Sequence, residues 1–147
     1  MKKYLFIFFA LIVAACSNKF SQTAAKVNYV SSVDGTITMR AIGIGTNKNL
    51  AISNAEINAF EILFFRGLPE SEQKIALIGS NIIQEKQKYQ RYFYRFYKDR
   101  QYRTFLMSSI PISEFGKNKS ITVDVKINLP ALRKDLEQNN MIRKFGY

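Results

Sequence analysis

Alternating apolar and polar residues predict several β-strands in this chain. The runs 27–33 and 36–44 flank Asp34-Gly35, a pair typical of two-residue hairpin turns because both turn positions adopt positive φ. Near the C-terminus, 121–127 places Ile and Val at every second position, which is the period of a half-buried strand. A further apolar run, 102–112, predicts a strand that pairs with it, with Pro111 favouring an edge position.

Helical spacing predicts three helices between and after these strands. The first covers 48–66 and has two apolar stripes, Ala51, Ala55, Ala59 and Ile62 on one side and Leu50, Ile57, Phe60 and Phe64 on another. A helix that is apolar on two sides is usually packed between two layers. The others cover 82–98 and 131–138, and 70–80 is expected to be mainly loop.

The order of these elements, β-β-α-α-β-β-α, predicts one α+β domain over residues 27–147. Two pairs of strands that are close in sequence favour a small, mostly antiparallel four-stranded sheet. The helices are expected to pack on one face of that sheet. The total length of 147 residues leaves room for one such domain and not two.

The first residues form a different kind of segment. Lys2 and Lys3 precede a run of twelve uncharged residues, 4–15, which is too short to span a bilayer and has the length of the apolar part of a signal peptide. Leu11-Ile12-Val13-Ala14-Ala15-Cys16 then resembles the lipobox of bacterial lipoproteins. The resemblance implies cleavage after Ala15 and attachment of a diacylglycerol to the Cys16 thiol. The alternative is an ordinary secretory signal with an incidental cysteine.

The position of Cys16 favours lipidation, because it is the only cysteine in the chain. Ser17 after it permits transfer to the outer membrane under the lipoprotein sorting rule, so we expect an outer-membrane anchor facing the periplasm. Residues 16–26 are mostly small and polar and predict a flexible tether, with a root-mean-square reach of roughly 17–19 Å. The signal peptide occupies residues 1–15 and the folded domain 27–147.

Composition excludes several classes of chemistry. The chain has no His, and its one Cys cannot form an intrachain disulfide or a zinc finger. Gly43-Ile44-Gly45 lacks the third glycine of a dinucleotide-binding motif, where Lys48 stands, and predicts a strand-to-helix turn instead. Glu56 and Glu61 diverge by about 140° around a helix, so we interpret them as solvated surface residues. No cofactor and no metal are expected.

Residues 86–103 are the most unusual stretch, with seven basic and seven aromatic side chains. On a helix the aromatic residues share one side, and Lys88, Arg91, Arg95 and Lys98 lie opposite with Tyr94 nearby. This phasing is expected from simple core packing. It also leaves a basic face that could dock an acidic protein patch, lipid phosphates or acidic glycans. Nucleic acid is discounted because the signal sequence directs the chain to the envelope.

The order of elements also resembles a family of small bacterial proteins. Gly43-Ile44-Gly45, the Ala51, Ala55 and Ala59 stripe and the last alternating strand are similar to small envelope lipoproteins of the flagellar-assembly-T and 20-kDa outer-membrane lipoprotein type. The resemblance would cover about residues 36–129. It implies adhesion or assembly roles and no catalytic residue.

These observations predict a non-enzymatic outer-membrane lipoprotein that acts as a structural or assembly subunit of a multiprotein envelope machine. An accessory lipoprotein of a type VI secretion system is one example. The partners would be the membrane, through Cys16, and other envelope proteins, through Lys88, Arg91, Tyr94, Arg95 and Lys98. The alternative function is binding of anionic envelope glycan or lipid headgroups by the same basic residues.

Lipidation makes a direct prediction about the Cys16 thiol. In the mature protein Cys16 should be a thioether, so the denatured wild-type chain should not react with a maleimide. The intact mass should correspond to residues 16–147 with acyl chains added. A mature chain with a free thiol would contradict the lipid anchor and favour the ordinary secretory signal.

Overall fold

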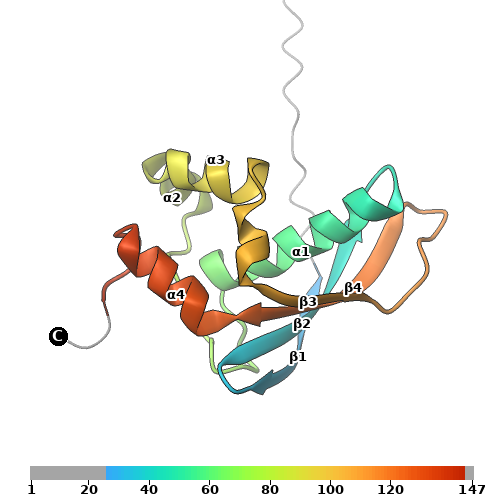
Figure 1. Ribbon diagram of the computed structural model, residues 1–147, viewed down its shortest axis with the longest axis horizontal. Coiled ribbons are helices and arrows are strands. Elements are labelled where there is room, and N and C mark those ends of the chain that lie inside the picture. Colours follow the sequence, from blue (N-terminus) through green and yellow to red (C-terminus); the bar gives the residue numbers. More distant parts are fainter. Residues whose placement is uncertain (1–25, 145–147) are drawn as a thin grey trace, which may run out of the picture.

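The computed structural model describes residues 26–144, and the α+β class predicted from the sequence is confirmed. Four antiparallel strands form one open sheet in the order β1-β2-β4-β3, and the helices gather on one side of it (Figure 1). The predicted signal peptide with Val13, Ala14 and Ala15, Cys16 and all but the last residue of the tether lie outside the described residues. The elements are β1 (Val27–Val33), β2 (Thr36–Ile44), α1 (Lys48–Phe65), α2 (Ile82–Lys88), α3 (Gln90–Lys98), the 3-10 helix η1 (Gln101–Phe105), β3 (Leu106–Pro111), β4 (Ser120–Asn128) and α4 (Leu129–Gln138).

The predicted hairpin between β1 and β2 is present. Asp34 and Gly35 both have positive φ, 48° and 73°, and they join strands with the bounds expected from the sequence. Val33 pairs directly with Thr36, so the turn contains two residues. This geometry matches the right-handed twist of the flanking strands.

Strands β2 and β4 form the centre of the sheet and separate its two faces. Ile37 pairs with Ile127 and Met39 with Val125, and all four side chains are buried on the helix side. The residues between them point to the opposite face, where none of the helices within 26–144 packs. That outer face carries mostly polar residues, including Arg40 and Asp124 at its middle.

Helix α1 lies between the sheet and the helices α2 and α3, as its two apolar stripes predicted. Ala51, Ala55 and Ala59 are fully buried, and α1 contacts both central strands. Phe60 and Phe64 extend to the other side. The prediction for Leu50 was wrong: this side chain is 47% exposed because it lies in the first turn, beyond the aromatic layer.

The single helix predicted over 82–98 is in fact two helices. The backbone leaves the helical region at Tyr89, where φ is −112° and ψ is 34°, and this residue ends α2 and begins α3. The Tyr89 hydroxyl donates to the carbonyl oxygen of Asn140 at 3.2 Å. This contact, with a residue 51 positions away, fixes the ring at the break.

The strand predicted over 102–112 begins later than expected. Arg100 adopts a left-handed conformation with φ of 55°, and η1 then replaces the first part of the strand. Tyr102 and Phe105 are three residues apart, so a 3-10 turn places both on one side, where they are buried. The final helix starts at Leu129, two residues before its predicted start, with the Asn128 side chain accepting from the Ala131 amide.

Within the described residues, no helix combines the length and the apolar character that crossing a membrane requires.

The close contact between α1 and β2 predicts that one methyl group added at Gly43 strongly lowers the stability of the fold. A Cβ at Gly43 would lie 2.0 Å from the Ala51 carbonyl oxygen and 2.4 Å from the Ala55 nitrogen. Gly43→Ala should therefore lower the free energy of unfolding by about 3 kcal/mol or more, measured by urea denaturation. Gly79→Ala is the matched control, because its Cβ would first meet the flexible Glu85 side chain at 3.2 Å. Equal stability of the two variants would contradict a close helix–sheet approach.

Candidate partner-binding surface on helix α3

Helix α3 is held by the aromatic side chains on its inner side. Tyr92, Phe93 and Phe96 are at most 5% exposed. The ring of Phe96 lies 5.2 Å from that of Phe60 and 5.1 Å from that of Phe64, both in edge-to-face geometry. Such pairs contribute about 0.5–1.5 kcal/mol each beyond the burial of their area. The inner side of α3 is therefore fixed on α1, and its outer side faces solvent.

Four of the five predicted partner-binding residues lie on that outer side. Arg91, Tyr94, Arg95 and Lys98 are all exposed and all belong to α3, and we call them the α3 basic row. Tyr94 is 62% exposed, although Tyr92 and Phe93 directly before it are buried. The opposite phasing of aromatic and basic residues inferred from the sequence is thus present in the fold.

The fifth residue, Lys88, is separated from the α3 basic row. It is exposed but belongs to α2, and the break at Tyr89 interrupts the helical spacing from which a continuous face was predicted. Its ammonium lies 4.8 Å from the centre of the Tyr89 ring. A hydrogen bond with Tyr89 also raises the pKa of Lys88.

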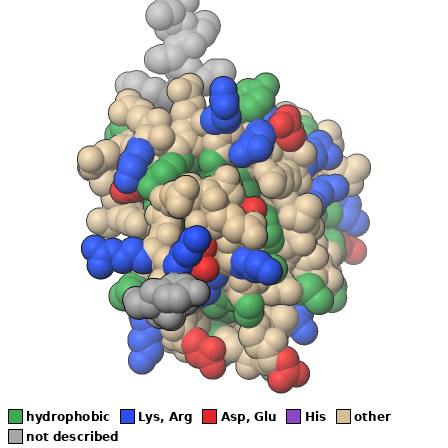
Figure 2. All heavy atoms as spheres, turned by 60° about the vertical axis from the view of Figure 1, so that its left-hand side comes forward, with side chains coloured by type: hydrophobic (Ala, Val, Ile, Leu, Met, Phe, Trp, Pro, Cys, Tyr) green, Lys and Arg blue, Asp and Glu red, His purple; other side chains and the backbone are tan. Residues whose placement is uncertain are grey.

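The charges of the α3 basic row are available to a partner. Among residues 26–144, neither Arg91, Arg95 nor Lys98 forms an ion pair with a carboxylate. Figure 2 shows the side of the molecule that carries α2, α3 and α4, where Lys and Arg side chains outnumber the Asp and Glu side chains scattered among them. This surface therefore favours acidic partners.

The interpretation of Glu56 as a solvated residue was wrong. Glu56 on α1 is 4% exposed and accepts a hydrogen bond from the Tyr102 hydroxyl at 3.1 Å. An Arg103 guanidinium nitrogen lies 3.7 Å from the same carboxylate. The sequence did not show this burial because both partners lie more than 45 positions away, in η1.

Glu61, about one and a half turns later on α1, belongs to a second cluster of polar side chains. The Lys86 ammonium lies 2.9 Å from its carboxylate, and the Tyr97 hydroxyl donates to the same group. The Lys86 nitrogen also lies 5.2 Å from the centre of the Tyr97 ring. Each α1 carboxylate thus binds one tyrosine and one cation from the layer above, and together these contacts fix α2, α3 and η1 relative to α1. Lys86 begins the basic and aromatic stretch 86–103, but no local pattern links it to Glu61, 25 positions earlier.

A third contact joins α3 to the C-terminal helix. The Tyr92 hydroxyl donates to Asp135 on α4 at 2.7 Å. Burial, together with Asp135, raises the pKa of Tyr92 well above its usual value of 10.0. Burial and the Glu61 carboxylate likewise raise the pKa of Tyr97.

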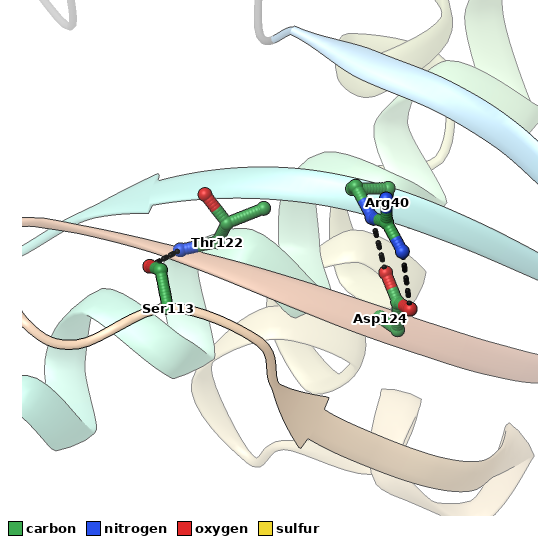
Figure 3. Close-up of polar contacts among 4 residues, drawn as sticks. All are labelled: Arg40, Ser113, Thr122 and Asp124. Carbon is green, nitrogen blue, oxygen red and sulfur yellow. Dashed lines mark hydrogen bonds and ion pairs between the residues drawn. The ribbon is translucent and has the colours of Figure 1, made fainter.

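The outer face of the sheet contains a separate polar pair. Arg40 on β2 donates two hydrogen bonds to Asp124 on β4, at 2.8 and 2.9 Å, and this raises the pKa of the arginine (Figure 3). Beyond it, the Ser113 hydroxyl accepts from the Thr122 amide at 3.0 Å. These contacts tie β2, β4 and the end of β3 together on a face that is open to solvent.

The described part of the chain offers little concave surface for a small molecule. Two shallow depressions, lined by 80–83 and by parts of α4, open broadly to solvent. Over residues 26–144 no three acidic or cysteine side chains gather closely enough to hold a metal ion. The surface features that remain are the α3 basic row and the outer face of the sheet.

Comparison with known proteins adds no relative, since no family model, no curated protein and no solved structure matches the chain.

The buried tyrosines predict a loss of stability at alkaline pH. The pKa values of Tyr92 and Tyr97 are raised in the folded state, whereas in the unfolded chain both ionise near pH 10. Their contribution is therefore complete below about pH 10 and is lost as the pH rises further. Denaturation between about pH 8 and pH 11 should give a smaller alkaline loss for Tyr92→Phe than for the wild type. Tyr94→Phe, which removes an exposed phenol, should behave as the wild type. An equal loss in all three proteins would contradict the prediction.

Proposed function

We propose that this chain is a non-enzymatic lipoprotein of the bacterial outer membrane that faces the periplasm. In this proposal it serves as a structural or assembly subunit of a multiprotein envelope machine, for example as an accessory lipoprotein of a type VI secretion system. The lipobox that ends at Cys16 supports the anchor. The exposed α3 basic row, on a helix whose other side is fixed by aromatic contacts, is the observation that carries the partner-binding role.

The residue types of the α3 basic row are suited to a protein partner. Tyrosine and arginine are enriched among the residues that dominate interface energies, and Tyr94 lies between Arg91 and Arg95 in the sequence. The helix backbone is already ordered, so binding has to restrict only the exposed side chains. This lowers the entropic cost of association.

The lipid anchor would act together with this surface. Acyl chains at Cys16 hold the domain at the membrane, and a tether of about ten residues keeps it near its envelope partners. Confinement of both molecules to one compartment raises their effective concentration without any new contact. A moderate affinity of the α3 basic row would then be sufficient for assembly.

The same observation supports a second candidate, a binding module for anionic envelope glycan or lipid headgroups. Three cations without ion-pair partners create a positive field that does not depend on the shape of the ligand. Binding of that kind is screened by salt, whereas a packed protein interface with Tyr94 at its centre is less sensitive.

Crosslinking in intact envelopes, followed by affinity purification and mass spectrometry, tests the proposal. Arg91→Glu/Arg95→Glu should lose a fixed set of envelope proteins that the wild type retains at high salt. Lys74→Glu/Lys144→Glu is the matched control, since it makes the same change in net charge at exposed positions outside α3. Retention of the same protein set by both variants would contradict the role of the row. Recovery of glycan or lipid alone, lost at high salt, would favour the second candidate.

A further inference from the structure

One end of the sheet combines exposed aliphatic side chains with lysines. The β2–α1 turn and the β3–β4 loop meet there, because the Gly45 amide donates to the Lys119 carbonyl oxygen at 2.9 Å. Figure 1 shows this turn and loop side by side, at the opposite end from α2 and α4. We call this region the tether end and define it by Ile44, Lys48, Leu50, Ile112, Lys117 and Lys119.

The aliphatic side chains of the tether end are exposed to solvent. Ile44 is 57% exposed, Leu50 47% and Ile112 44%. They come from a strand, a helix and a loop, so the fold and not a local run of sequence gathers them. Grouped exposed apolar residues with a polar rim are typical of an interaction surface.

The charge around these side chains is positive. Lys48, Lys117 and Lys119 are all exposed, and Glu114 is the only acidic residue in the two segments 45–48 and 112–119. The nearest carboxylate on the outer face, Asp124, is already neutralised by Arg40. Aliphatic side chains surrounded by lysines are the combination that binds an interface of anionic lipid.

The chain enters the folded domain at this same end. Lys26, the first residue described, is exposed, and its carbonyl oxygen accepts from the Ile42 amide at 3.2 Å. Ile42 pairs with Thr122, whose carbonyl oxygen accepts from the Ile112 amide at 2.9 Å. One row of residues across the sheet thus connects the point where the tether leaves with the exposed Ile112. About ten residues separate this row from Cys16, a root-mean-square reach of roughly 17–19 Å.

We propose that the tether end rests on the anionic phospholipid headgroups of the membrane that holds the anchor. Ile44, Leu50 and Ile112 enter the interface, and the lysines meet lipid phosphates. This orientation rests on the proposed lipidation of Cys16. On α1, Phe60 and Phe64, which make the aromatic contacts with α3, lie about 18 and 24 Å along the helix axis from Lys48 at the tether end. The orientation therefore directs the α3 basic row away from the lipid, toward partners.

Two positions of the sheet form a matched pair for a test. Ile44 and Val33 are each 57% exposed and both lie on the outer face, but Val33 is at the hairpin, near the opposite end of β2. We would introduce Ile44→Cys or Val33→Cys into the processed protein and reconstitute it in vesicles that contain phosphatidylglycerol. The readout is the rate of reaction with a bulky, water-soluble maleimide.

In these vesicles the cysteine at position 44 should react about tenfold or more slowly than the one at position 33. Each lysine near an anionic surface favours the docked state by roughly fivefold, so three lysines favour it by about a hundredfold. Lys48→Gln/Lys117→Gln/Lys119→Gln should bring the two rates to within about twofold of each other, with the protein still bound through its lipid. Equal rates without these changes would overturn the orientation and leave the anchor in place.

The wild-type chain tests the proposed anchor separately from this inference. Cys16 is its only cysteine, so the chain reacts with the maleimide only if Cys16 carries no lipid. If it does react, the anchor is wrong, and the same pair of variants is compared in a Cys16→Ser background with vesicles added from outside. Slower reaction at position 44 would then still support binding of anionic lipid by the tether end. Equal rates would overturn it.

Discussion

The close approach of α1 to β2 is the constraint on which the other features of this fold depend. Gly43 leaves no room for a side chain between the strand and the helix, and Ala51 and Ala55 bring the helix backbone against the sheet. Because the small side chains of α1 face the sheet, Phe60 and Phe64 lie on the opposite side of the helix. The aromatic layer that holds α3 therefore follows from the spacing of small residues.

The aromatic layer explains why the α3 basic row can be well ordered although its own residues have few contacts. Rings of α1, α3 and η1 pack at centroid distances of about 5–6 Å, and two α1 carboxylates bind tyrosine hydroxyls and cations at its border. The carboxylates of Glu56 and Glu61 therefore hold α2, α3 and η1 in position on α1. The row gains a fixed backbone from packing beneath it, while its charged groups stay hydrated and available.

The two ends of α1 give the domain a polarity that suits a tethered adaptor. Its first turn follows the β2–α1 turn that contacts the β3–β4 loop, and its second half carries the layer that supports α3. The surface proposed to meet lipid at one end and the surface proposed to bind protein at the other contain different residues. The open outer face of the sheet, with its Arg40–Asp124 pair, lies along the side between these ends.

The sequence by itself determined the elements and the phase of their side chains. Local spacing was enough to predict the hairpin at Asp34-Gly35, the alternation of β4, the two faces of α1 and the exposed side of α3. These features depend on periods of two and of about 3.6 residues, which can be read within a short window. For the same reason, four of the five predicted partner-binding residues lie on one surface.

Only the tertiary structure decided the break at Tyr89, the burial of Glu56 and the assembly of the tether end. Tyr89 contacts a carbonyl oxygen 51 positions away, and Glu56 meets a hydroxyl 46 positions away. Ile44, Leu50 and Ile112 lie at one end of the sheet because β4 pairs with both β2 and β3 and the β2–α1 turn contacts the β3–β4 loop. Such contacts join residues that are distant along the chain, so no local pattern of hydrophobic and polar positions records them.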